Sequence, residues 1–178
     1  MIREFAVRPM PKNKKARTLF FILLSAAAAT VVASYFLTSY KGIVQLGSLI
    51  LLVSAVVIYT RYLGSVYSYE VTYDSDETPI FVVCQLSGKR RTSLCRVDLA
   101  DIVEISLLSA EAYRAYKTEP GMKRYNYTPT LFPEEVYLMK VRSRTERADV
   151  FLELSAECRD TLLAYAATAR SLRTEDDL

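Results

Sequence analysis

Two long runs of apolar residues dominate the first part of the chain. Residues 18–40 contain no charged side chain, and residues 42–60 form a second uncharged run that is closed by Arg61. Because a helix rises about 1.5 Å per residue, about 20 residues cross a hydrocarbon core roughly 30 Å thick. Neither run has the polar face that an amphipathic core helix requires. We therefore predict two membrane-spanning helices, at about residues 18–40 and 43–63, joined by a tight turn at residues 39–42.

Two other interpretations of these runs fit less well. A pair of buried helices in a soluble core needs a large shell of other residues, and residues 65–178 are too few to surround them. A cleavable signal peptide ending near residues 26–29 has an apolar stretch of about 7–15 residues, which the first run exceeds. A second run also follows at once, so we favour a retained helical hairpin.

Small residues recur every four positions in the first run. They form two adjacent rows: Ser25, Ala29 and Ala33, and beside them Ala26, Thr30 and Ser34. Such rows let helix backbones approach closely. Because the short turn already brings the two helices together, packing within the hairpin is favoured over dimerisation.

The charges around the hairpin predict its orientation. Residues 1–17 carry six basic side chains and one acidic one, whereas the turn carries only Lys41. Basic flanks stay in the cytoplasm, so we expect both termini of this multi-pass plasma-membrane protein to be cytoplasmic. The three cysteines are an odd number rather than a disulfide framework, which suits a reducing compartment.

After residue 65 the long apolar runs end, and apolar and polar residues begin to alternate with a period of two. Residues 66–73 alternate and predict a strand, and turn residues follow at 74–79. Further strands are predicted at 80–86, 92–97, 102–108, 135–142 and 148–154, with part of 124–130 as another. Ser155 is a good N-cap for a last element at about 156–172, where an apolar stripe at helical spacing predicts an amphipathic helix. The pattern is about seven strands closed by one helix.

Three segments carry a resemblance to a known family. They are YEVTY (Tyr69–Tyr73), RVDLADIVEI (Arg96–Ile105) and LELSAEC with its helix (from Leu152). In this order they resemble bacterial pleckstrin-homology-like (PH-like) domains, many of which are joined to two N-terminal membrane helices. The resemblance implies an α+β membrane protein: a transmembrane hairpin, then a PH-like antiparallel β-barrel or bent sheet capped by a C-terminal helix. The segment 109–133 departs from it, because a short hairpin connection is expected there.

This resemblance and the charge pattern divide the chain into three parts. They are a basic cytosolic segment at 1–17, the hairpin at 18–64 and a cytosolic PH-like domain at 65–178.

Composition argues against catalysis. The chain has no histidine, so the commonest general base and metal ligand is absent. Five scattered glycines form no phosphate-binding loop, and the three cysteines lie far apart in sequence. Cys84 and Cys95 face each other if the hairpin turns near Lys89, but two small apolar residues are favoured over a redox pair. We expect no enzyme activity and no catalytic, cofactor or metal site.

Two basic features are candidate contacts with lipid or a partner. The first is the tip of the predicted hairpin, and the second is the tyrosine-rich segment after residue 109; the candidate residues are Lys89, Arg90, Arg91, Arg114, Tyr116, Lys123 and Arg124. The loop that binds phosphoinositides in PH domains is acidic here, at residues 74–77, so that lipid site does not carry over. A solvated tip is favoured over a specific lipid site.

The tyrosine-rich segment allows several interpretations. Its tyrosines suit ordinary packing in the domain, and they suit equally well a contact with a membrane interface or with a protein. Residues 65–178 carry 15 basic and 19 acidic side chains, so nucleic acid is not expected as a partner. The sequence predicts a non-enzymatic binding or scaffolding module at the inner membrane face, holding a protein partner or copies of itself. The alternative is a lipid or small-ligand sensor that reads anionic headgroups through these basic and tyrosine-rich loops.

Overall fold

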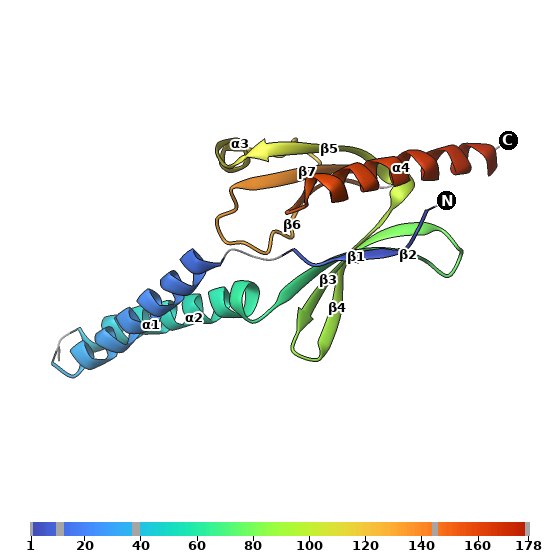
Figure 1. The fold of residues 1–178 in the computed structure, drawn as a ribbon. Helices are drawn as coiled ribbons and strands as arrows, with labels where there is room; N and C mark the ends of the chain where they lie inside the picture. The colour runs from blue at the N-terminus through green and yellow to red at the C-terminus, as the bar shows by residue number, and fades with distance from the viewer. Residues whose placement is uncertain (1, 10–12, 37–39, 144–145, 177–178) are drawn as a thin grey trace. The chain divides into compact units, whose positions relative to one another are not determined.

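The protein forms two compact units, each described here by itself. Figure 1 shows a computed structural model that describes residues 2–9, 13–36, 40–143 and 146–176. One unit is Pro11–Ser65, and the other combines Met1–Met10 with Val66–Leu178. The helical unit is therefore inserted between the first strand of the second unit and the rest of it.

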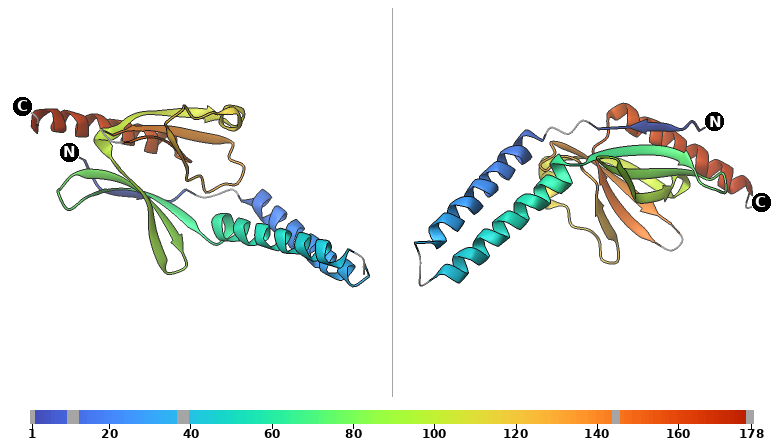
Figure 2. Two further views of the ribbon diagram at one scale, coloured as in Figure 1. Left: turned by 180° about the vertical axis from the view of Figure 1, so that it is seen from behind. Right: turned by 90° about the horizontal axis from the view of Figure 1, so that it is seen from below.

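The inserted unit is a helical hairpin. Helix α1 spans Lys14–Ser34, and α2 spans Lys41–Ile58 and continues into a π-helical turn at Tyr59–Leu63. The two helices lie side by side in Figure 2. Lys14–Ser34 and Lys41–Leu63, of 21 and 23 residues, are long and apolar enough to cross a membrane. The predicted turn residue Ser39 lies outside the described residues.

Small side chains line the contact between the two helices. Ala27 and Ser34 of α1 and Ser48 and Ala55 of α2 are buried, and the Ser48 hydroxyl donates to the Ala27 carbonyl at 3.2 Å. The predicted row that ends in Ser34 therefore packs within the hairpin. Most of the large apolar side chains point away from this contact, as Ile22 does at 58% exposure and Leu46 at 59%.

The second unit contains two four-stranded sheets. The first has the order β1 (Phe5–Val7), β2 (Val66–Tyr73), β3 (Pro79–Ser87) and β4 (Arg90–Asp98). The second has the order β5 (Ile102–Ser109), β7 (Glu135–Arg142), β8 (Arg147–Leu152) and β6 (Lys123–Asn126). A 3-10 turn at Leu99–Asp101 joins them, and the Asp98 side chain caps it by accepting from the Ala100 amide.

Of the two expected forms, an antiparallel β-barrel or a bent sheet of about seven strands, a closed barrel does not form among the described residues. The described strands make two separate sheets, with eight strands in all. Strand β1 adds to β2 from before the hairpin, with Phe5 opposite Val71 and Val7 opposite Tyr69. Strand β6 runs parallel to β8 and occupies an edge. Because β4 and β6 are both sheet edges, one side of the domain stays open.

The core lies between the two sheets and α4 (Ala156–Asp176). Cys158, Leu162, Ala166 and Ala169 of α4 are buried, which is the stripe expected of an amphipathic helix. The Phe5 and Tyr165 rings, 6.1 Å apart, bring β1 into this core.

Buried Tyr69 ties the first sheet to the second. Its hydroxyl donates to the Tyr127 carbonyl at 3.0 Å and accepts from the Glu153 amide at 3.3 Å. Burial raises the pKa of this phenol strongly, so the bridge persists at any physiological pH.

The long segment after β5 covers the outer face of the second sheet. It begins with the short helix α3 (Ala110–Ala115), whose N-cap is the Ser109 hydroxyl, accepting from the Ala112 amide at 3.2 Å. Rings from this segment pack with β-strand side chains in a small second core of Val136, Leu138 and Phe151 with Leu108, Tyr113 and Tyr116. Packing is therefore the structural role of the segment where a plain hairpin connection was expected.

A β-bulge in the β3–β4 hairpin separates the two cysteines that were considered as a pair. The turn has Gly88 at φ +57, a conformation that glycine adopts without strain. The register shifts between Val83 and Cys84, so Cys84 is opposite Ser93 while Cys95 is opposite Val83. The Cys84 side chain lies on the outer face and the Cys95 side chain faces the core, which rules out a disulfide between them in this fold.

Candidate functional site

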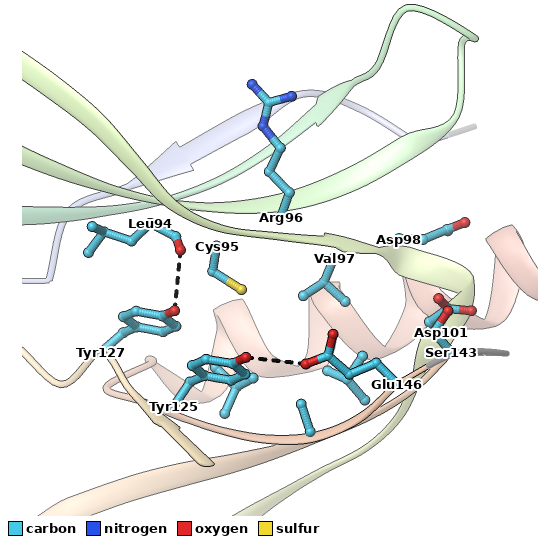
Figure 3. Close-up of a pocket in the computed structure, with 13 residues that line it drawn as sticks. Leu94, Cys95, Arg96, Val97, Asp98, Asp101, Tyr125, Tyr127, Ser143 and Glu146 are labelled. Atoms are coloured by element: carbon cyan, nitrogen blue, oxygen red, sulfur yellow. Dashed lines mark hydrogen bonds between the residues drawn. The ribbon is translucent and has the colours of Figure 1, made fainter. Parts of the chain in front are cut away.

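A cavity of about 360 Å³ opens between β4 and the β6–β8 side of the second sheet. Figure 3 shows it beneath β4, with the tyrosines of the β6 region at one end. Its apolar lining is Val97 above and Val141, Ala148 and Val150 below, which also belong to the main core. The volume is within the usual range for small-ligand sites. The cavity on the open side of the domain therefore reaches down to core residues that are themselves buried.

Strand alternation and the bulge direct side chains into the cavity. The bulge adds one residue to β4, and both Leu94 and Cys95 then pack on the core side. On β6, Tyr125 is in register with Val150 of β8 and so faces inward with it. Tyr127 follows β6, and its amide donates to the Phe151 carbonyl at 3.0 Å, which prolongs the pairing with β8.

Two stacked tyrosines form one wall of the cavity. The rings of Tyr125 and Tyr127 are parallel to within 3°, with centroids 6.2 Å apart. The Tyr125 hydroxyl donates to Glu146 Oε1 at 3.2 Å, and the Tyr127 hydroxyl donates to the Leu94 carbonyl at 3.3 Å (Figure 3). The second bond spans the open side from one sheet to the other. Burial raises the pKa of Tyr127, so this phenol remains a donor.

Carboxylates make up most of the cavity's polar rim. Asp98, Asp101 and Glu146 line it, while the guanidinium of Arg96 points away, to the far side of β4 (Figure 3). Lys123 forms an ion pair with Glu146 at 3.1 Å. Its hydrogen bond, with that of Tyr125, lowers the pKa of the Glu146 carboxyl.

Charge at the other end of the rim comes from α4. Arg173 pairs with Asp101 at 2.9 Å. Between the two ends, burial raises the pKa of the Cys95 thiol, which keeps it protonated and poorly nucleophilic.

A second cluster lies on the outer face of the same sheet. The guanidinium carbon of Arg124 is 4.6 Å from the centre of the Phe151 ring and 5.6 Å from that of Tyr113. Beside it, the Tyr116 hydroxyl donates to Asp149 Oδ2 at 2.6 Å. Asp149 has no exposed surface, and its Oδ1 has no hydrogen-bond partner among the described residues. Arg124 caps this aromatic cluster as a cation stacked on ring faces.

The candidate contact residues from the sequence are divided among several places. Tyr116 and Arg124 come together in the outer cluster, whereas Lys123, one residue before Arg124, pairs with Glu146 at the cavity rim. Arg114 is exposed on α3. The structure therefore splits the tyrosine-rich segment between the two faces of the sheet.

The predicted basic tip is divided as well. Lys89 and Arg90 are exposed at the turn, but Arg91 forms an ion pair with Glu70 of β2. Its Nε also donates to the Cys84 sulfur at 3.5 Å, and these contacts raise the pKa of the guanidinium. Of the three tip residues, Arg91 is thus paired within the domain, although its side chain remains 59% exposed.

The sequence did not predict how several of the site residues are brought together. Asp149 carried a signal, because it is the one charge in the apolar strand ADVFL and such a residue needs a buried partner. No local pattern indicates that Cys95, Tyr127 and Glu146 lie together, because their proximity depends on how the edges of two sheets face each other. Within the described parts of the chain, no three His, Cys, Asp or Glu side chains form a group that could hold a metal ion.

Comparison with known families decides the classification. Residues 5–169 match the family described as Bacterial PH-like domain (DUF6106). The chain belongs to this family. The match extends from β1 through the helical hairpin to the last turns of α4, so the PH-like domain here includes the strand that precedes the hairpin. No curated protein and no solved structure matches the chain.

Proposed function

We propose that this protein is a non-enzymatic integral membrane protein whose PH-like domain is a binding or scaffolding module on the cytoplasmic side. The observation that carries the proposal is the cavity between the sheets. Its apolar base is formed by the buried core residues Ala148 and Val150, and its rim carries polar side chains, a combination typical of binding sites. The proposed role of the cavity is to receive part of a partner that the domain holds at the membrane.

The surface of the hairpin supports the membrane anchor. Side chains such as Ile22, Leu46 and Val53 are more than half exposed, which is costly in water and favourable in lipid. Lys14, Lys15 and Arg17 lie at the start of α1, and Arg61 lies near the end of the second helix. Basic residues at these two ends favour a cytoplasmic position for both, and hence for the PH-like domain.

The side chains of the cavity support binding rather than catalysis. Its thiol, Cys95, has a raised pKa, and both phenols donate to acceptors within the domain. A nucleophile requires a neighbouring base or a lowered pKa. The groups in this cavity instead suit recognition.

Crosslinking in native membranes, followed by affinity purification and mass spectrometry, tests the proposal. We expect a specific protein partner, or copies of the chain itself, to be recovered with the wild type. Ala148→Leu fills the cavity and should abolish recovery, whereas Ala112→Leu on the exposed face of α3 should not. Thermal melting of each variant confirms folding. Recovery that is unaffected by Ala148→Leu, or no specific recovery by the wild type, contradicts the proposal.

One observation favours a second candidate function, contact with anionic lipid. Leu86 of β3 is opposite both Val66 and Arg91, so the tip with Lys89 and Arg90 lies at the end of the sheet where β2 begins. Val66 follows Leu63, the last residue of the second apolar helix, by three positions along the chain. Each basic residue near an anionic bilayer contributes about 1 kcal/mol of attraction.

Hydrogen exchange in nanodiscs tests the lipid contact. Amides at residues 86–92 should be better protected in nanodiscs that contain anionic lipid than in neutral ones. The double variant Lys89→Gln/Arg90→Gln should remove the difference, while Lys117→Gln, an exposed residue of the tyrosine-rich segment, should retain it. Equal protection in both lipids refutes the contact.

A further inference from the structure

Most of the polar side chains that line the cavity present acceptors, although the Ser143 hydroxyl and the Cys95 thiol can also donate. Its carboxylates, Asp98, Asp101 and Glu146, cannot donate when ionised. The two phenols already donate to Glu146 and to the Leu94 carbonyl, so only their lone pairs face a ligand. Both hydrogen bonds to the Glu146 carboxylate end on Oε1, and Oε2 remains able to accept. A ligand that fits must therefore bring donors.

The charge of the cavity points in the same direction. Among the described residues of the lining, Arg96 is the one cation, and its guanidinium lies on the far side of β4 (Figure 3). The cations that pair with the rim, Lys123 and Arg173, are 63% and 42% exposed and approach it from the solvent. Exposed ion pairs of this kind are weak and can share their carboxylates with another cation.

The walls determine what kind of cation fits. Tyr125 and Tyr127 offer a stacked aromatic wall, and aromatic rings attract cations to their faces. The lining by Val97, Val141 and Val150 is apolar and excludes a small, fully hydrated ion. The site requires an apolar body that carries a planar or compact donor group.

From these three properties we infer that the cavity binds an organic cation, an ammonium, amidinium or guanidinium group attached to an apolar body. The inference rests on the proposed function, since it names the chemistry that the same cavity recognises. The group belongs either to a Lys or Arg side chain of the held partner or to a free small cation. An anion would be repelled by three carboxylates, and a neutral apolar molecule would form no charge-assisted hydrogen bond with them.

Three probes of one shape test the charge assignment. Benzamidine, benzamide and benzoate share a ring and differ in carrying a positive, zero or negative charge. Their binding is measured by calorimetry on the full chain in nanodiscs at low salt. We expect benzamidine to bind with one-to-one stoichiometry and about tenfold or more tighter than benzamide, because charge-assisted hydrogen bonds are roughly twice as strong as neutral ones. Benzoate should not bind detectably.

Matched variants locate the binding. Glu146→Gln should weaken benzamidine about tenfold and leave benzamide unchanged, since it removes charge from the rim and keeps the shape. Glu104→Gln is the control, because this carboxylate pairs with Lys140 on the outer face of the sheet. Tyr125→Leu should also weaken benzamidine by removing one ring. Thermal melting verifies that each variant is folded.

The outcomes separate this inference from the proposed function. Equal binding of benzamidine and benzamide, preference for benzoate, or unchanged binding in Glu146→Gln overturns the cation assignment. If none of the probes binds while Ala148→Leu still loses its partner, the cation assignment fails and the binding module stands. Displacement of the recovered partner by benzamidine assigns the cation to a partner side chain, and binding without displacement assigns it to a free cation.

Discussion

The Tyr116 hydroxyl donates a 2.6 Å hydrogen bond to Asp149, a carboxylate with no exposed surface. Asp149 lies in a row of alternating charge that crosses the second sheet. In strand register, Lys140 is opposite Asp149 on one side and Arg124 is opposite it on the other. Lys140 in turn pairs with Glu104 at 3.1 Å. Opposite charges on neighbouring strands stabilise a sheet, so the row accounts for a buried carboxylate in an apolar strand.

Tyr116→Phe should destabilise the PH-like domain by about 1–3 kcal/mol, because it leaves a buried carboxylate without its hydrogen-bond donor. Asp149→Leu combined with Tyr116→Phe should recover part of that loss, since removing both partners avoids an unsatisfied group. Thermal unfolding of the full chain in detergent, arranged as a double-mutant cycle, measures the coupling. Tyr35→Phe, at a ring that is 76% exposed, is the control and should be neutral. Additive effects of the two changes would show that Tyr116 and Asp149 do not stabilise each other.

Long periodic patterns made much of this fold predictable. The strands at Val66–Tyr73 and Glu135–Arg142 lie where alternation predicted them, and α4 begins at Ala156 beside the predicted N-cap. Alternation of apolar and polar residues indicates that one face of a strand is buried. This local pattern can be recognised in a single sequence. The existence of the two apolar helices was predictable for the same reason.

The missed features are short or depend on distant partners. Strand β1 has three residues, and β2, its partner, begins at residue 66, so nothing local indicates that the two pair. Helix α3 has six residues, too few for a helical period to be visible. The cavity depends on two sheet edges meeting across Tyr127 and Leu94, which are 33 residues apart. Pairings of this kind are set by tertiary packing and not by local propensity.

Strand β1 should be required for a stable PH-like domain although it precedes the hairpin. Phe5→Ala removes a ring that packs against Tyr165 and the main core, and we expect a loss of about 2–4 kcal/mol, near the low end of the range for buried Phe. Thermal unfolding of the full chain in detergent measures it. Ala6→Ser, on the exposed face of the same strand, is the matched control. Equal stability of the two variants would mean that β1 is dispensable.

The hairpin should depend on small residues between its helices. Ala55→Leu places a large side chain where Ala55 is 1% exposed, and we expect a cost of about 1–3 kcal/mol from overpacking. Ser48→Ala should cost less, about 0.6 kcal/mol, the typical value of a hydrogen bond between membrane helices. Ser54→Ala is the control for Ser48→Ala, because its hydroxyl bonds only within α2, to the Ile50 carbonyl at 2.8 Å. Thermal unfolding in detergent should rank the three variants in this order, and a larger effect of Ser54→Ala would contradict the interface.

Glu153 should make the stability of the domain fall as pH rises from acid to neutral. Burial raises the pKa of this carboxyl above its ordinary value near 4.5, against the lowering effect of two hydrogen bonds from Thr130. Between the ordinary and the raised pKa the folded state binds more protons than the unfolded state, so unfolding becomes easier as pH increases through that window. Glu153→Gln should remove this component from the profile of melting temperature against pH, while Glu104→Gln should retain it. A Glu153→Gln profile parallel to that of the wild type would refute the assignment.

Cys158 should be resistant to alkylation in the folded protein. Burial raises its pKa to about 11, and the neighbouring charge of Glu157 acts in the same direction. Because the thiolate is the reacting form, a pKa about two units above the ordinary value lowers the reactive fraction at pH 8 about 100-fold. Iodoacetamide labelling of the full chain, followed by peptide mass spectrometry, should therefore modify Cys158 slowly. In urea its rate should rise to that of Cys84 and Cys95, since unfolding equalises the three environments. Rapid labelling of Cys158 without denaturant would place α4 away from the core and contradict the packing of the helix on the two sheets.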